Sequence, residues 1–379
     1  MKMFKKVLKI VGIVIAIPVV LALVFFGWLT FNEYRPKDVE KVSIDTSQGE
    51  GKKFTQGEEV SVVTWNMGYG ALGDNADFFM DGGTSVMSAT QERLDVNLAG
   101  FMGMLSTLDP DILFIQEIDK DSKRSYHVDE VEKIKNDYPV LVKVPNSEDK
   151  NFNGYVNTFA YNFKSKIVPF PPKEPIGKVE SGIATMSKYQ ITDAERHSLP
   201  CPFKWPVKTV NLKRCLLVNR TPVYDKDGND TGKELVLVNL HLEAYDDGSG
   251  KVEQTKVLKK IIQSEVDKGN YVIAGGDFNQ TFDNTEAFSR YPIQKDKWKP
   301  GIMDAFDIGN DFQCLMDNTT PTCRSLDQSY QNADKDNFQY YLIDGFIVSN
   351  NIKVNKLETV NTYFAPSDHN PVLLNFTIE

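Results

Sequence analysis

Residues 271–280, Tyr-Val-Ile-Ala-Gly-Gly-Asp-Phe-Asn-Gln (YVIAGGDFNQ), join an apolar run to two polar side chains. The run 271–274 has the composition of a short buried strand. In an extended chain, side chains at positions i and i+2 point to the same face, so Asp277 and Asn279 are expected to enter one space together. The glycine pair leaves room above them. The stretch therefore predicts a strand that ends either in a turn or in an active site.

Other polar residues lie at or near the end of similar apolar runs. They are Asn66, Glu117, His241, Asp344, Asp368 and His369. Asp344 stands inside an apolar run, where a buried carboxylate requires a partner. The chain has four histidines, and two of them belong to this set. The other two, His127 and His197, lie in polar contexts and are expected to be bystanders.

These residue types suit one kind of chemistry. Carboxylate and amide oxygens without clustered cysteines are ligands typical of Mg²⁺ or Mn²⁺ rather than of structural zinc. A His–Asp pair supplies an oriented imidazole that handles a proton near neutral pH. Together with amide donors, such a set fits hydrolysis of a phosphoryl ester by an attacking water. We therefore predict a Mg²⁺-dependent phosphoesterase, with Mn²⁺ as a substitute ion.

The rest of the chain alternates short strand-like runs with helical patterns. Helices are predicted at 90–108, near 128–138 and at 251–268 from apolar residues three and four positions apart. Strands are predicted at 59–68, 111–117, 181–191, 234–244, 271–274, 340–349 and 371–378. Residues 145–180 are rich in Asn, Pro and Gly and receive no element. This alternation predicts one α+β domain over residues 59–379.

The N-terminus predicts a membrane anchor. A basic segment, 1–9, precedes an uncharged apolar run, 10–31, and about 20 such residues span a bilayer as a helix. The lysines favour a cytoplasmic N-terminus and place the rest of the chain outside a cell membrane. Residues 32–58 lack periodicity and are interpreted as a linker. A long cleaved signal peptide is the alternative.

Charge and cysteines give weaker indications. The formal net charge is −9, and setting aside the four lysines of segment 1–9 changes it to −13 for the remainder. An acidic domain is a poor partner for the phosphate backbone of long nucleic acids, which disfavours a nuclease without excluding one. The four cysteines form two local pairs, 201/215 and 314/323, which are either two disulfides or four free thiols. A monomer is expected.

The order of the motifs resembles a known superfamily. They are TWNMG (64–68), IQEID (115–119), SGIATMSKY (181–189), NLHLEA (239–244), GGDFNQ (275–280), IDGFIVS (343–349) and SDHNPV (367–372). Their order is similar to that of the endonuclease/exonuclease/phosphatase superfamily, which includes DNase-like nucleases, neutral sphingomyelinases and inositol-polyphosphate 5-phosphatases. The resemblance spans about residues 59–379. It implies a four-layer α/β/β/α sandwich of two mixed β-sheets, in addition to the transmembrane helix.

The resemblance also implies a metal site. By motif match, Glu117 would be the main Mg²⁺ ligand. Asn66 would lie beside it, and Asp368 would be available to the same ion or to a second one. Whether one or two ions bind is left open.

The remaining matched residues would act on the phosphate. Asp344 would hydrogen-bond His369, and this dyad would act on the phosphate or the attacking water. Asp277 would orient or deprotonate the water, and Asn279 would hold the phosphate or the water. His241 would donate to a phosphate oxygen. The resemblance does not decide whether Asp277 or the dyad takes the proton.

The substrate stays open among several classes. The anchor and the acidic domain favour a lipid or small phosphodiester at the cell surface, in a sphingomyelinase-like reaction. The aromatic segment 200–206 would either dip into a membrane or pack its own aromatics. The alternatives are an extracytoplasmic nuclease, an inositol-phosphate phosphatase with segment 211–215 as its basic cluster, and a non-catalytic binding protein.

Overall fold

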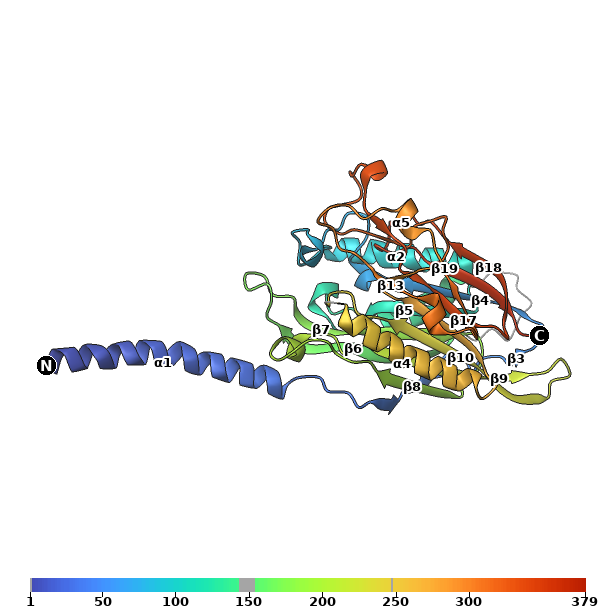
Figure 1. The fold of residues 1–379 in the computed structure, drawn as a ribbon, viewed down its shortest axis with the longest axis horizontal. Helices are drawn as coiled ribbons and strands as arrows, with labels where there is room; N and C mark the ends of the chain where they lie inside the picture. The colour runs from blue at the N-terminus through green and yellow to red at the C-terminus, as the bar shows by residue number, and fades with distance from the viewer. Residues whose placement is uncertain (1, 143–153, 247) are drawn as a thin grey trace.

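Two mixed β-sheets packed face to face form the centre of the molecule (Figure 1). This computed structural model describes residues 2–142, 154–246 and 248–379. One sheet contains β1 (Val39–Lys41), β8 (Asp193–Ser198), β9 (Cys215–Tyr224), β10 (Asp230–His241), β11 (Tyr271–Asp277), β17 (Asp344–Ser349) and β14 (Phe312–Leu315) in that order, and β3 (Phe54–Thr55) pairs with β9. The other has the order β18 (Lys353–Thr359), β19 (Val372–Thr377), β4 (Glu59–Asn66), β5 (Ile112–Asp119), β7 (Gly177–Ser187), β6 (Val156–Val168) and β2 (Ile44–Asp45).

Long helices cover the outer faces of both sheets. Helices α2 (Gln91–Leu108) and α3 (Glu130–Val142) lie on the sheet that contains β4, and α4 (Ser249–Val266) lies on the sheet that contains β10 (Figure 1). The apolar stripe of α2 packs against β4 and β5, and Leu258 and Ile262 of α4 pack against β10 and β11. A third apolar cluster fills the space between the two sheets. The predicted four-layer α/β/β/α arrangement is therefore confirmed.

The ends of α2 follow from its local sequence. Thr90 caps the helix because its hydroxyl accepts a 3.2 Å hydrogen bond from the Arg93 backbone N–H. At the other end Asp109 adopts a left-handed conformation with φ 42°, and its N–H bonds to Leu105 O. Pro110 follows and cannot continue the helix.

Short elements complete the connections. Two small ladders pair β12 (Gln280–Phe282) with β13 (Gly301–Met303) and β15 (Cys323–Arg324) with β16 (Tyr340–Tyr341). The single-turn helices are α5 (Ala287–Arg290), α6 (Ala305–Ile308), η1 (Gly68–Gly70), η2 (Phe79–Asp81), η3 (Lys123–Ser125), η4 (Val207–Val210) and η5 (Lys335–Asn337).

The segment interpreted as a linker, 32–58, is not a free tether. Strand β1 pairs with β8, β2 with β6, and β3 with β9, so this segment adds strands to both sheets. Phe54 is fully buried between the sheets. Strands of two or three residues are too short to show a period of two, which is why the sequence pattern missed them. Strand β6 was also missed, and residues 145–153 of the unassigned stretch lie outside the described residues.

Helix α1 (Lys2–Phe31) projects from the domain (Figure 1). The span Met3–Phe31 contains an 18-residue window with a mean hydropathy of 3.0 and is long enough to cross a membrane, although a signal sequence passes the same test. It starts before the predicted residue 10 because the N-terminal lysines are good helix formers.

All four cysteines are free thiols, so the disulfide interpretation is wrong. Cys314 packs in the apolar cluster under α4, whereas Cys323 packs with Tyr341 and Ile343 in a separate cluster. Cys215 faces a third cluster, between β9 and β6. Proximity in the sequence did not translate into proximity of the sulfur atoms, because the residues face different parts of the core.

Candidate active site

Three adjacent strands of the β10-containing sheet place three of the predicted site residues side by side. In the parallel pair β10–β11, His241 lies opposite Asp277. In the antiparallel pair β11–β17, Asp277 lies opposite Asp344. His241 Nε2 is 3.4 Å from Asp277 Oδ2. Gly275 and Gly276 make this pairing possible, since a Cβ on Gly276 would lie 1.9 Å from Leu240 O.

The other sheet contributes Asn66, the last residue of β4, and Glu117, which lies near the end of the neighbouring strand β5. The Asn66 side-chain N–H donates a 3.1 Å hydrogen bond to Asp277 Oδ2 and so links the two sheets. Its Oδ1 accepts a 3.0 Å hydrogen bond from the Gly68 N–H. Residue Asn66 is 1% exposed, so this amide is fixed between the two layers.

Glu117 occupies a β-bulge. The register between β5 and β7 shifts between Ile115 and Ile118, and Glu117 has a φ of 52°. A bulge re-aims a side chain that regular pleating would point elsewhere, and a non-glycine residue at positive φ is strained. The Glu117 carboxylate consequently lines the central cavity, with 28% of its side chain exposed.

His369 and Asp344 form the predicted dyad. His369 Nδ1 lies 2.9 Å from Asp344 Oδ2. The Trp65 indole N–H donates to His369 O at 2.8 Å, and the His369 N–H donates to Ser367 Oγ at 3.1 Å. These bonds fix the backbone of His369, so its free ring nitrogen, Nε2, has a defined direction.

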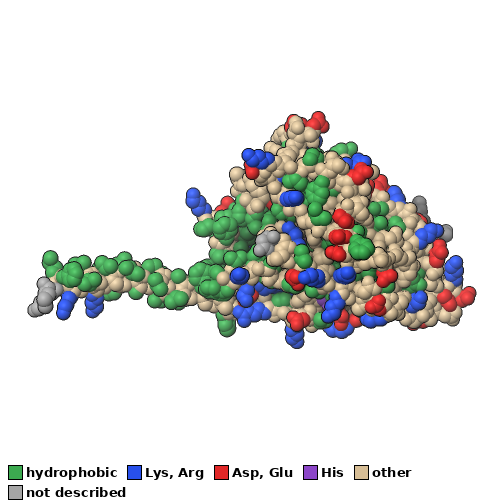
Figure 2. Space-filling model, viewed as in Figure 1, with side chains coloured by type: hydrophobic (Ala, Val, Ile, Leu, Met, Phe, Trp, Pro, Cys, Tyr) green, Lys and Arg blue, Asp and Glu red, His purple; other side chains and the backbone are tan. Residues whose placement is uncertain are grey.

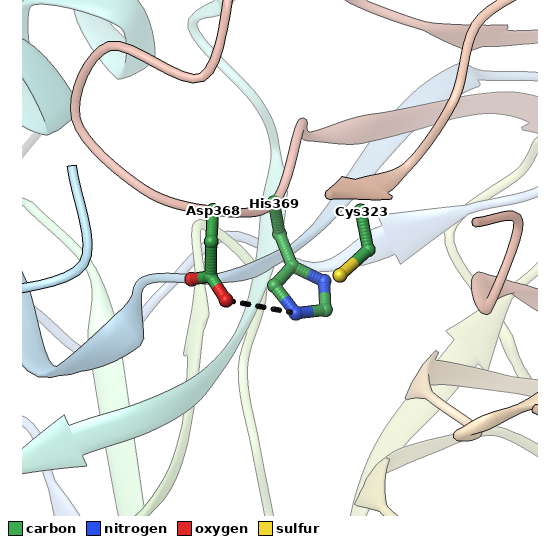
Figure 3. A group of neighbouring side chains, drawn as sticks. All are labelled: Cys323, Asp368 and His369. Atoms are coloured by element: carbon green, nitrogen blue, oxygen red, sulfur yellow. Dashed lines mark ion pairs between the residues drawn. The ribbon is translucent and has the colours of Figure 1, made fainter. Parts of the chain in front are cut away.

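His369 Nε2 faces two further carboxylates. It lies 3.9 Å from Asp277 Oδ2 and 3.9 Å from Asp368 Oδ2, the second of which is drawn in Figure 3. Burial would lower the pKa of His369, but the facing carboxylates, Asp344 foremost, hold it well above its usual value. The facing carboxylates therefore favour the protonated form of His369.

The pKa values of two residues beside the dyad, Asp277 and His241, are shifted in opposite directions. Burial, together with the nearby Asp344 carboxylate, raises the pKa of Asp277 above its usual range. Burial, assisted by the positive charges of Arg214 and His369, lowers the pKa of His241 well below its usual value. Burial therefore favours the neutral form of His241.

Asn279 is held in a left-handed conformation with φ 50°. Its backbone N–H donates to Asp277 Oδ1 at 2.8 Å, and one side-chain N–H donates to Leu242 O at 2.9 Å. The second side-chain N–H is the group that remains for a ligand in the cavity. Asp277 and Asn279 thus lie together, as their spacing predicted.

Glu117 and Asp368 fit a hard divalent cation. Burial raises the pKa of both carboxyl groups, and the charge of Asp368 adds to the shift on Glu117. Gly68 leaves room for Asp368, because a Cβ there would lie 2.9 Å from Asp368 Oδ1. Two carboxylates that lie close enough for one to raise the pKa of the other form an oxygen donor set typical of Mg²⁺ or Mn²⁺.

Two other groups of possible ligands have a different explanation. Ligand atoms of Cys323, Asp368 and His369 lie within 4.8 Å of one another (Figure 3). Burial raises the pKa of the Cys323 thiol to about 12, so the sulfur is protonated and is a poor metal ligand. Asp277, Asp344 and His369 are equally close, but the dyad hydrogen bond already joins two of them.

These residues form the floor of a cavity of about 580 Å³. The predicted site residues that line it are Glu117, His241, Asp277, Asn279, Asp368 and His369. Asn66 and Asp344 lie behind the floor, hydrogen-bonded to Asp277 and His369. The structure therefore brings all eight predicted residues together. His127 and His197 pair elsewhere with Asp121 and Glu195, as expected of bystanders.

The walls contain residues that the sequence analysis missed. Arg124 and Arg214 line the cavity, and Arg124 stacks 3.6 Å from the centre of the Tyr69 ring. Arg214 belongs to the basic segment 211–215, but Arg124 had no strand or motif to mark it. The remaining wall is largely apolar, with Phe78, Phe163, Phe170, Phe203, Val207, Leu212 and Trp298 among its residues.

Comparison with known proteins agrees with this architecture. The model of the endonuclease/exonuclease/phosphatase family matches residues 63–369. An endonuclease/exonuclease/phosphatase from Beutenbergia cavernae shares the fold with a TM-score of 0.51 and 14% identity, covering 84% of this chain and 72% of that chain. No curated protein sequence matches the chain.

Two further solved structures are similar at lower scores. TDP2 from D. rerio, complexed with a single-strand DNA product, has a TM-score of 0.48 and 13% identity over 84% of this chain and 99% of that chain. The human Nocturnin catalytic domain with bound sulfate has a TM-score of 0.46 and 14% identity over 86% of this chain and 95% of that chain.

Proposed function

The chain belongs to the endonuclease/exonuclease/phosphatase family, and from this premise we propose that it is a Mg²⁺-dependent phosphodiesterase acting on a lipid or small phosphodiester at a membrane surface. Members of this family are generally hydrolases of phosphoester bonds and usually use divalent metal ions. The observation that carries the proposal is the His369–Asp344 dyad, which faces Asp277 and Asp368 on the floor of one cavity.

The floor residues take different roles in the proposed reaction, because their pKa values are shifted differently. His369, charged and oriented by Asp344, donates a proton or a charged hydrogen bond from Nε2 to a phosphate oxygen. Asp277 is a carboxylate of raised pKa within 3.9 Å of that nitrogen, and it accepts a proton from the attacking water. Neutral His241 and the free N–H of Asn279 orient the phosphate.

Glu117 and Asp368, with Asn66 beside them, would hold Mg²⁺ or Mn²⁺. A bound ion supplies polarisation of a phosphate oxygen and offsets the charge that develops on it. Arg124 and Arg214 also line the cavity, where ion pairs with Asp119 and Glu243 hold their guanidinium groups in place.

A lipid substrate is supported by the wall that adjoins α1. The segment 203–212 lines the cavity with Phe203, Val207 and Leu212. The same segment contacts the end of α1, where the Trp205 indole N–H donates to Thr30 Oγ1 at 2.9 Å. Hydrophobic side chains gather at this end of the domain (Figure 2), and Trp205 is 56% exposed. We therefore propose the first of the two roles considered for segment 200–206, in which its aromatic side chains dip into the membrane surface.

The ordered connection after α1 supports the same arrangement. Glu33 pairs with Lys213 at 3.1 Å, and both side chains are largely buried. If α1 is a retained anchor with its lysines in the cytoplasm, the cavity opens outside the cell beside the bilayer surface. A lipid headgroup there would reach the floor from the membrane, and an apolar wall would accommodate the first part of its acyl chains.

The proposal is tested with the full-length chain in mixed micelles containing Mg²⁺. Sphingomyelin and plasmid DNA serve as parallel substrates, and His369→Ala is compared with His127→Ala, which replaces an exposed histidine. We expect release of phosphocholine that requires Mg²⁺ and is lost only in His369→Ala. Plasmid nicking without lipid hydrolysis would overturn the lipid assignment in favour of a nuclease. Absence of turnover on any phosphodiester would overturn the enzymatic function.

A further inference from the structure

The cavity contains a carboxyl group that the proposed chemistry does not use. Asp81 ends η2 and lines the cavity wall. Its Oδ1 accepts a 2.9 Å hydrogen bond from the Tyr245 hydroxyl. Throughout 2–142, 154–246 and 248–379, no Lys, Arg or His side chain forms an ion pair with Asp81. Asp81 is half-buried in the cavity wall, so its carboxylate is open to a cation in the cavity.

The surroundings of Asp81 make its negative charge unfavourable. Burial raises the pKa of Asp81 to about 7, and the carboxylates of Asp368, Glu117 and Asp327 add to the shift. The hydrogen bond from Tyr245 opposes it only in part. A cation placed against Asp81 would therefore stabilise its ionised carboxylate.

Aromatic rings line the same part of the cavity. Tyr245, Trp298 and Tyr341 are all cavity residues. The rings of Trp298 and Tyr341 meet edge to face, with centroids 5.2 Å apart. The Trp298 indole N–H donates to Ala244 O at 3.1 Å, which fixes the ring beside the residue that precedes Tyr245. The charge of Asp81 also contributes to the raised pKa of Tyr341, so the Asp81 carboxylate lies near that ring.

The ammonium group of Lys251 lies near these rings but interacts with other groups. Lys251 Nζ is 5.5 Å from the centre of the Trp298 ring. It donates to Ala244 O at 2.9 Å and lies 3.7 Å from Asp246. Lys251 is not among the residues that line the cavity, so it does not occupy the space in front of Asp81.

We propose that Asp81, Tyr245, Trp298 and Tyr341 form a subsite for a quaternary ammonium group on the alcohol side of the substrate phosphodiester. Aromatic faces and a carboxylate attract such a cation without having to satisfy N–H donors. A primary ammonium brings three donors, and a wall made mainly of rings offers few acceptors for them. This inference rests on the proposed phosphodiesterase function and names its substrate class, a choline-type phosphodiester.

Two soluble esters that differ in one atom test the subsite. The full-length chain, in uncharged detergent with Mg²⁺, is assayed on p-nitrophenyl phosphocholine and on p-nitrophenyl 3,3-dimethylbutyl phosphate, in which carbon replaces the quaternary nitrogen. We expect kcat/KM to favour the choline ester by about 10-fold, which corresponds to about 1.4 kcal/mol. Asp81→Asn should remove this preference by raising KM for the choline ester alone. Asp336→Asn, at an exposed carboxylate, should leave it unchanged.

The outcomes separate the subsite from the catalytic function. Equal kcat/KM for the two esters, or an equal loss on both in Asp81→Asn, would overturn the subsite while the phosphodiesterase stands. If Asp81→Asn does not fold, Tyr245→Phe replaces it, since it keeps the ring and removes the hydrogen bond to Asp81. Tryptophan fluorescence, titrated with tetramethylammonium chloride against sodium chloride, tests the subsite without turnover. A change that is specific to tetramethylammonium and lost in Trp298→Phe supports it, and identical titrations contradict it.

Discussion

His369 Nδ1 lies 2.9 Å from Asp344 Oδ2, a bond that joins a strand of one β-sheet to the segment that leads into the other. Asp344 is the first residue of β17, whereas His369 shortly precedes β19 in the opposite sheet. The Asn66–Asp277 hydrogen bond crosses between the sheets in the same region. The site therefore exists only when the two sheets are packed together, and its chemistry depends on that packing.

Asp344→Asn should inactivate the chain without unfolding it. The amide keeps the shape of the carboxylate but does not stabilise a charged His369, so kcat should fall by about 10² to 10⁴ with KM little changed. The measurement is steady-state hydrolysis of bis-(p-nitrophenyl) phosphate in Mg²⁺, with Asp336→Asn as the matched control. An unchanged kcat in a folded Asp344→Asn protein would show that the dyad does not act in the reaction.

Glu117→Gln should weaken cation binding. It removes one of the two facing carboxylates while keeping an oxygen at the bulge, so we expect the apparent Mg²⁺ affinity to fall by about 10-fold or more. The readout is the rise in melting temperature on titration with Mg²⁺, since an ion that binds the folded state stabilises it. Glu253→Gln, on the exposed side of α4, is the control. Equal Mg²⁺ responses of both variants and wild type would remove Glu117 from the metal site.

Gly276→Ala should destabilise the fold strongly. Its added Cβ would lie 1.9 Å from Leu240 O, a backbone atom of the neighbouring strand that cannot move aside, and φ is 149°. We expect a loss of about 2 kcal/mol or more in the free energy of unfolding. Gly103→Ala is the control, because it lies in α2 with nothing within 4 Å of the new Cβ. It should stabilise the chain by about 0.5–1 kcal/mol. Urea unfolding measures both.

The start of the folded domain can be located by truncation. A chain that begins at residue 36 keeps β1 and β2, whereas one that begins at residue 51 loses both. The chain that begins at residue 51 also loses Val42 and Ile44, which pack against Val156, Ile191 and Ala194. We expect the shorter chain to be less stable by about 2 kcal/mol, since apolar contacts and two edge strands are removed. Coincident urea transitions for the two chains would restore the linker interpretation.

The pH dependence of stability should reveal Asp81. Folding raises its pKa from 3.8 to about 7. Between these values the folded chain keeps a proton that the unfolded chain has lost, so the free energy of unfolding falls as pH rises through this window. Asp81→Asn removes this dependence. The melting temperature of Asp81→Asn, measured relative to that of wild type, should therefore rise between about pH 5 and about pH 8. A difference that is constant with pH would mean that the Asp81 pKa is not raised.

The sequence allowed much of the fold and the site to be predicted. The apolar periods of α2 and α4 and the runs in β4, β5, β10, β11 and β17 were long enough to assign. The eight site residues could be identified because each lies within or next to a predicted buried strand, where a polar side chain requires a reason, and because the motifs that contain them resemble those of a known superfamily. Short strands β1, β2 and β3 were missed, because their few residues pair through the backbone and need no side-chain pattern.

The sequence by itself therefore allowed the type of chemistry to be predicted, since oxygen ligands and a His–Asp pair at strand ends belong to few reactions. Tertiary structure decided which groups share the cavity. Arg124, Asp81 and Tyr245 carry no motif and come from connecting segments, and the free thiols depend on which core each cysteine faces. Local periodicity fixes the face of an element, whereas the distance between two elements follows only from the packing of whole sheets.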